Sequence, residues 1–163
     1  MSQSTSSRRG TEWMDRENRF RRSWNPDTVF QEVSPELHLL RLRNSFNETG
    51  LAYKPSRGRR VCLYVRTLPG LDAEPFFERL RAEARTRGWQ AGQEFHDDQG
   101  PQAPMQSIGW LQVRKHIREG FSDGVIVTDR FHISRDGEQY IDELRFVHES
   151  LGVTVLLVPE APT

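Results

Sequence analysis

The pattern of apolar and polar residues changes at about residue 60. After that point, short apolar runs alternate with longer segments whose apolar residues recur at helical spacing. An apolar run bounded by turn residues predicts a buried strand, and apolar residues three and four positions apart predict an amphipathic helix. The predicted strands cover 61–66, 89–98 (nearer an edge), 123–129 and 153–159, and the predicted helices cover 71–88, 105–120 and 137–152.

This alternation of strand and helix predicts parallel pairing through right-handed crossovers. The strands are nearly continuous apolar runs, which is typical of a sheet covered by helices on both faces. Each predicted helix ends at a glycine, the residue that most readily adopts the backbone conformation of a helix C-terminus. The sequence therefore predicts a three-layer α/β domain over residues 59–160, with a roughly four-stranded, mainly parallel sheet.

Residues 1–58 are predicted to form an N-terminal extension that is partly helical and partly disordered. Ser34 and Pro35 suit the N-cap and the first position of a helix. The predicted segments are a disordered start rich in Ser, Thr and Arg (1–11), a short charged helix (12–22), a helix that begins after Ser34 (34–46) and a linker rich in Gly, Pro and Arg (47–60).

Charge is unevenly distributed along this chain, whose formal net charge is zero. Of its 23 basic and 23 acidic residues, 12 and 7 lie in residues 1–60, which leaves 11 and 16 in residues 61–163. The first part therefore carries +5 and the second −5. A basic segment favours contact with a polyanion, so DNA is a predicted partner of this segment. Aromatic residues within 12–46 favour another interpretation, in which this segment packs on a protein partner or on its own domain.

The composition disfavours several classes of protein. The one cysteine, Cys62, cannot form an internal disulfide or a cysteine-based zinc site. The sequence begins without an apolar signal region and has no apolar run of membrane-spanning length, so a cytoplasmic protein is expected. His96, Asp97 and Asp98 are compatible with a hard-metal site, although a solvated strand end is the favoured interpretation. No Gly-rich phosphate-binding motif is present, and we expect neither a cofactor nor a metal.

Candidate chemistry gathers where the predicted strands end. Ligands of open α/β sheets bind beyond the carboxyl ends of the strands. Arg66 ends the first strand, Asp129 and Arg130 end the third, and Arg135 lies further along the same loop. Guanidinium groups make planar, bidentate contacts to phosphate oxygens. Either the three arginines converge on a phosphodiester or another oxyanion, with Asp129 orienting one of them, or they are solvated strand ends.

Five short motifs, taken in order, resemble those of one known family. They are "YVR" (64–66), "RGW" (87–89), "DDQG" (97–100), "VTDR" (127–130) and "SRD" (134–136). At these spacings, residues 60–160 resemble the N-terminal catalytic domain of the serine recombinases, the resolvase/invertase family. The resemblance implies that family's α/β fold. It also implies DNA strand exchange, in which a serine attacks a phosphodiester and arginines stabilise the transition state.

The candidate site residues follow partly from this resemblance. The predicted nucleophile position falls on Leu68, and the position of another family arginine falls on Ser107. Leucine cannot attack phosphorus. Thr67 and Ser134 are the substitute candidates, but Thr67 is one residue early and would point to the opposite face of its strand. The predicted phosphate-binding residues are Arg66, Arg130 and Arg135, and the supporting residues are Tyr64, Asp98, Asp129 and His132.

A further departure from the family lies at the end of the sequence. Family members continue into a dimerisation helix and a helix-turn-helix DNA-binding module, whereas this sequence ends at "VPEAPT". We therefore expect the C-terminal DNA-binding module to be absent. The oligomeric state is left open.

Three functions remain open at this point. The favoured one is a non-catalytic resolvase-like domain, a pseudoenzyme that binds DNA phosphate or a protein and regulates DNA recombination-related processes. The second is a divergent recombinase or other phosphoryl-transfer enzyme that cuts DNA with Thr67 or Ser134. The third is a purely structural protein-interaction module.

Overall fold

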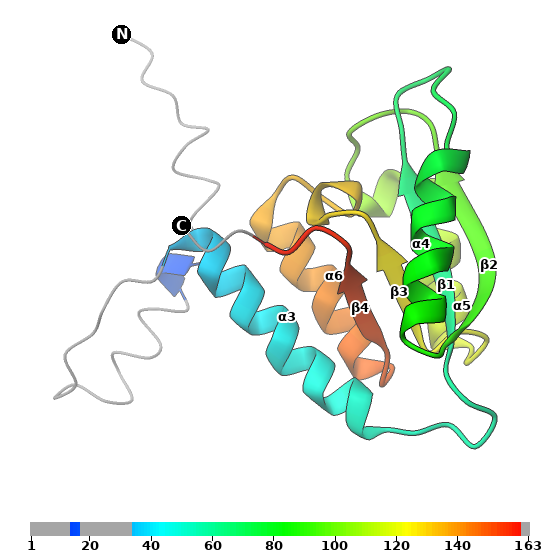
Figure 1. Ribbon diagram of the computed structural model, residues 1–163. Helices are drawn as coiled ribbons and strands as arrows, with labels where there is room; N and C mark the ends of the chain where they lie inside the picture. Colours follow the sequence, from blue (N-terminus) through cyan, green and yellow to red (C-terminus); the bar gives the residue numbers. More distant parts are fainter. Residues whose placement is uncertain (1–13, 17–33, 161–163) are drawn as a thin grey trace, which may run out of the picture.

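The apolar runs form a four-stranded sheet in which every pair of strands is parallel. The computed structural model describes residues 14–16 and 34–160. The strands are β1 (Arg60–Arg66), β2 (Gln90–Asp97), β3 (Gly124–Val127) and β4 (Val153–Leu156). Their order in the sheet is β2-β1-β3-β4 (Figure 1). The predicted parallel sheet is confirmed, with β2 at one edge.

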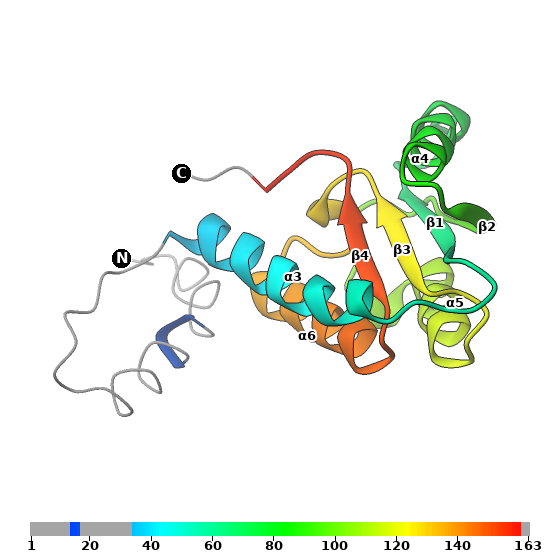
Figure 2. The same cartoon turned by 60° about the horizontal axis from the view of Figure 1, so that its bottom comes forward.

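Helices cover both faces of this sheet. Helix α4 (Glu74–Thr86) lies on one face, and α5 (Ile108–Arg118) and α6 (Gly137–Glu149) lie on the other (Figure 2). Alternate residues of β1 supply the two cores, because successive side chains of a strand point to opposite faces. Tyr64 packs in the core on the α5 and α6 side, and Val65 packs in the core beneath α4. The three-layer prediction is therefore confirmed.

Helix α3 (Pro35–Ala52) packs along the sheet edge formed by β4 and against α6 (Figure 2). The Ser34 hydroxyl accepts the Leu37 N–H at 3.3 Å, so the predicted N-cap is present. The Asn47 amide donates to the Thr154 carbonyl at 2.8 Å and accepts the Thr154 N–H at 2.9 Å. One side chain thus makes both hydrogen bonds that a neighbouring strand would offer to this residue.

Helix α3 extends six residues beyond its predicted end at Phe46. Asn47 and Gly50 have low helix propensity and indicated a linker, but tertiary contacts hold this last part in place. A Cβ atom on Gly50 would lie 2.4 Å from the Gly152 carbonyl oxygen. The glycine therefore allows the helix to approach the backbone between α6 and β4. Of the predicted helix at 12–22, only residues 14–16 are described, and they form a helical turn.

The topology places the carboxyl ends of two neighbouring strands in position to hold a ligand. The strand order reverses between β1 and β3, and loops from both strands leave the sheet at their carboxyl ends. The loop after β2 contains the short 3-10 helix η1 (Pro104–Gln106), and the loop after β3 contains η2 (Arg130–His132). Within the described ranges, no helix combines the length and the apolar character needed to cross a membrane.

Candidate functional site

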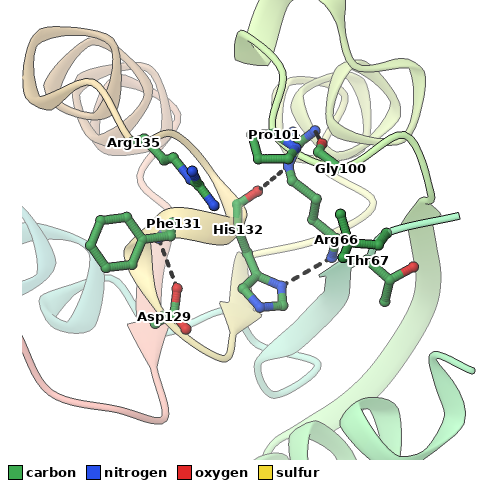
Figure 3. Close-up of a pocket in the computed structure, with 9 residues that line it drawn as sticks. Arg66, Thr67, Gly100, Pro101, Asp129, Phe131, His132 and Arg135 are labelled. Atoms are coloured by element: carbon green, nitrogen blue, oxygen red, sulfur yellow. Dashed lines mark hydrogen bonds between the residues drawn. The ribbon is translucent and has the colours of Figure 1, made fainter. Parts of the chain in front are cut away.

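A pocket of about 190 Å³ lies beyond the carboxyl ends of β1 and β3 (Figure 3). It lies at the reversal of strand order, where ligands of open α/β sheets bind. Three loops build it, one after each of β1, β2 and β3. The lining residues are Arg66, Thr67, Leu68, Gly100, Pro101, Asp129, Phe131, His132 and Arg135.

Arg66 joins these three loops from within the protein. Its Nε donates to the His132 carbonyl at 2.9 Å, and its terminal nitrogens donate to the Gly100 carbonyl at 3.0 Å and the Ser107 hydroxyl at 2.7 Å. These bonds use three of the five N–H groups of a guanidinium. The residue is 8% exposed. Arg66 is therefore mainly a tie between loops, with two N–H groups left for a ligand.

His132, in the loop after β3, makes a further hydrogen bond to Arg66. Its Nδ1 accepts the backbone N–H of Arg66 at 3.0 Å, so the neutral ring carries its proton on Nε2 (Figure 3). Burial lowers the pKa of His132; the Asp129 carboxylate opposes this shift and the Arg66 guanidinium adds to it. A neutral imidazole is the form that fits this hydrogen bond.

The predicted arginines are only partly brought together. Arg66 and Arg135 line the pocket, and Arg135 is exposed. Arg130 does not line it: its guanidinium carbon lies 4.5 Å from the Phe131 ring centroid and 6.0 Å from that of Tyr140. Arg130 begins the tight η2 turn, in which successive side chains point in different directions. Three guanidinium groups were expected around one space, but only those of Arg66 and Arg135 belong to residues that line the pocket.

Asp129 lines the pocket and also caps the η2 turn. One of its carboxylate oxygens accepts the Phe131 N–H at 2.8 Å. This bond is typical of an aspartate at the start of a turn. It orients the carboxylate, and no arginine contact is needed to explain the position of Asp129.

Leu68 occupies the predicted nucleophile position at the pocket and is 57% exposed. The neighbouring Thr67 is 5% exposed, and its hydroxyl lies 2.7 Å from Nε2 of His96. Both of those side chains belong to the face of the sheet that carries α4, opposite to Arg66. The predicted orientation of Thr67 is therefore present.

Ser134, the other substitute candidate, is 3% exposed and does not line the pocket. Its hydroxyl donates to the Gln139 side chain at 2.9 Å and accepts the Asp136 N–H at 3.1 Å. These bonds stabilise the start of α6. Neither substitute hydroxyl therefore faces the guanidinium groups of the pocket.

Tyr64 and Asp97 form a buried pair beneath the site. The Tyr64 hydroxyl donates to Asp97 at 2.7 Å, and the Gly109 and Trp110 N–H groups donate to the same carboxylate at 2.8 and 3.0 Å. Asp97 thus accepts two of the free N–H groups at the start of α5. Burial is the main cause that raises the pKa of Tyr64, so its hydroxyl remains a proton donor.

Sequence reasoning chose Asp98 as a supporting residue and missed the role of Asp97. Asp98 is exposed and accepts a bond from the neighbouring Gln99 amide at 2.9 Å. The alternation of β2 could have separated the two aspartates, because Phe95 points into the α5 core and Asp97 lies on the same face. His96 lies on the opposite face, so the "FHDD" stretch does not gather metal ligands. No group of three potential metal ligands occurs within the described ranges.

Solved structures with this fold are catalytic domains of serine recombinases, although no family model and no curated protein matches the sequence. The N-terminal catalytic domain of TP901-1 integrase is 20% identical, with a TM-score of 0.54 over 61% of this chain and 77% of that chain. The C-terminal catalytic domain of ISC1926 TnpA, an IS607-like serine recombinase, is 21% identical, with a TM-score of 0.52 over 60% of this chain and 70% of that chain. The fold of this chain is therefore that of the serine-recombinase catalytic domains, as its motifs predict.

Proposed function

We propose that this domain is a non-catalytic resolvase-like module that binds DNA phosphate in recombination-related processes. The observation that carries the proposal is Leu68. An exposed leucine side chain occupies the pocket position at which the resemblance to serine recombinases expects an attacking hydroxyl. Phosphoryl transfer through a covalent intermediate requires a nucleophile at that point.

The pocket still supports binding of an anion. Arg135 is exposed on its rim, and Arg66 retains two N–H groups after bonding to its three protein acceptors. Guanidinium groups are well matched to phosphate oxygens. DNA is the polyanion that the resemblance favours, and the +5 charge of residues 1–60 would add attraction to it.

One contact favours a second candidate function, a divergent phosphoryl-transfer enzyme. The Thr67 hydroxyl lies 2.7 Å from His96, and a hydroxyl beside an imidazole is the usual arrangement of an activated nucleophile. However, Thr67 is 5% exposed and lies on the face opposite to Arg66. A phosphate held by the arginines would not be in line with this hydroxyl, so the binding function is favoured.

The binding function is tested by measuring DNA affinity against salt concentration. Each phosphate contact contributes a slope of about −0.7 to −0.9 in a plot of log affinity against log salt. We expect Arg135→Ala to reduce the slope by about this amount. Arg118→Ala is the matched control, because it removes an exposed arginine from the end of α5, near the start of β3 and away from the pocket. Absence of DNA binding, or equal slopes in both variants, would contradict the proposal.

The non-catalytic part is tested separately with supercoiled DNA. We expect no covalent protein–DNA adduct and no strand cleavage with the wild-type protein. An adduct that disappears in Thr67→Ala or in Ser134→Ala would establish the enzymatic alternative.

A further inference from the structure

We propose that the pocket holds one unpaired nucleotide of a DNA strand, with its base against Phe131, the base edge at Asp129 and a phosphate at Arg135. This inference rests on the DNA-binding function proposed above, and it names the part of the DNA that the pocket holds. A pocket that served the phosphate backbone alone would not need an exposed aromatic wall.

The apolar side of the pocket is unusually open to solvent. Phe131 is 52% exposed and Leu68 is 57% exposed, and both line the pocket, as does Pro101. Single-stranded nucleic acids bind to such surfaces because every base offers a flat face that stacks on an aromatic ring. The guanidinium carbon of Arg130 lies 4.5 Å from the Phe131 ring centroid, which gives this ring a cationic neighbour. Aromatic and cationic groups side by side are typical of a nucleotide-binding surface.

The polar side offers groups that suit a base edge. One oxygen of Asp129 accepts the Phe131 N–H, which leaves its other oxygen available as an acceptor. Carboxylates in DNA-binding proteins accept the exocyclic amino group of cytosine. His132 carries its proton on Nε2 because Nδ1 is occupied by the Arg66 N–H, and this residue also lines the pocket. We therefore expect a base that bears an amino group to bind more tightly than thymine.

The small size of the pocket favours one nucleotide of a longer DNA strand. Pockets that enclose whole small molecules measure roughly 300–1,000 Å³, whereas this pocket measures about 190 Å³. The nucleotide must therefore come from a single strand or be turned out of a duplex, which is easiest where the base is already unpaired.

The inference is tested with the full chain and three fluorescent DNA probes of equal length. These are oligo-dC, oligo-dT and a strand made of abasic residues, and anisotropy gives each affinity at one salt concentration. We expect oligo-dC to bind more tightly than oligo-dT and about tenfold more tightly than the abasic strand. Phe131→Ala should remove the advantage over the abasic strand, and Asp129→Asn should remove the preference for oligo-dC over oligo-dT.

The matched control is Phe121→Ala, because Phe121 is 56% exposed and lies between α5 and the start of β3, away from the pocket. This variant should retain the full advantage of oligo-dC over the abasic strand. Since both phenylalanines are exposed, thermal unfolding should show that both variants remain folded.

The outcomes separate this inference from the function on which it rests. Equal binding of all three strands, unchanged in Phe131→Ala, would overturn the nucleotide pocket but leave phosphate binding in place. No binding to any strand at low salt would overturn both, and the exposed side chains would then indicate a protein partner.

Discussion

Asp97 shows how one side chain can position a whole loop. Its carboxylate accepts hydrogen bonds from Tyr64 and from two backbone N–H groups at the start of α5. A buried carboxylate at a helix N-terminus satisfies donors that the helix itself cannot satisfy. The position of α5, and with it Ser107 beside Arg66, therefore depends on a residue outside the pocket.

We expect Asp97→Ala to lower the free energy of unfolding by about 2–4 kcal/mol, because two buried N–H groups and one hydroxyl lose their acceptor. Tyr64→Phe removes a single donor and should cost about 1–2 kcal/mol. The adjacent Asp98→Ala is the control and should change stability by less than about 0.5 kcal/mol. Urea unfolding of the three variants measures this order. An Asp98→Ala effect equal to that of Asp97→Ala would contradict the assignment.

The pairing of His132 with the Arg66 backbone predicts sensitivity to acid. Because burial lowers the pKa of His132 in the folded state, the unfolded chain binds the proton more readily. Stability should be fully present above the unfolded pKa of about 6.5 and should fall as the pH decreases below it. Protonation of Nδ1 also removes the acceptor of the Arg66 N–H.

His132→Asn is the variant that isolates this effect, since its side-chain oxygen can replace Nδ1 as acceptor without titrating. We expect the urea midpoint of this variant to depend less on pH in the acidic range than that of the wild type. Identical pH profiles for the two proteins would show that His132 does not control the loop.

At the scale of elements, α3 protects the edge strand β4. An unpaired strand edge offers free N–H and C=O groups to other chains. The Asn47 amide occupies both groups of Thr154, and the close approach at Gly50 brings the end of the helix against the backbone before β4. The helix is therefore an integral part of the described fold.

We expect Asn47→Ala to destabilise the protein by about 1–3 kcal/mol, because two buried backbone groups of the edge strand lose their partner. Asn44→Ala is the matched control on the exposed side of α3, where the same change only improves helix propensity. Thermal unfolding gives the stabilities, and light scattering reports association through the uncovered edge. A loss that is equal in both variants would assign no special role to Asn47.

The elements that could be predicted are those whose own residues determine them. Helices α4, α5 and α6 have clear apolar faces, and their observed bounds lie within a few residues of the predicted ones. The end of α3 was predicted too early, because Gly50 weakens a helix locally but is required by a contact with Gly152. Contacts between distant segments decided this boundary.

The site was predicted in position but only partly in its contacts. The topology rule indicated the loops after β1, β2 and β3, and the pocket lies among these loops. The three acceptors that engage Arg66 come from two loops: Gly100 and Ser107 follow β2, and His132 follows β3. No pattern along the chain reports that a guanidinium is already occupied, so Arg66 was assigned wholly to a ligand.

At the scale of the molecule, a buried charge cluster joins three parts of the fold. Glu160, after β4, accepts the Tyr140 hydroxyl of α6 at 2.5 Å and lies 3.6 Å from the Arg43 guanidinium of α3. Burial raises the pKa of Glu160, and the hydrogen bond from Tyr140 and the nearby charge of Arg43 oppose this shift. The cluster therefore couples α3 to the segment that follows the last strand.

This coupling predicts non-additive effects of mutation. Glu160→Gln should cost about 2–4 kcal/mol, because the half-buried Arg43 loses its counter-charge. The double variant Arg43→Met with Glu160→Gln should cost less than the sum of the two single changes. A double-mutant cycle by urea unfolding measures the interaction. Strict additivity would mean that the two side chains act independently.

The hydrogen bonds of Asn47 also affect which edge of the sheet can pair with a strand of another chain. Among the described residues, α3 covers the β4 edge, so the edge that remains for strand addition is that of β2 (Gln90–Asp97). Pairing between two copies through their sheets would then have to be β2 against β2. Such a contact is two-fold symmetric and uses the free β2 edge of both copies. Pairing through the sheets would therefore give dimers and not fibres.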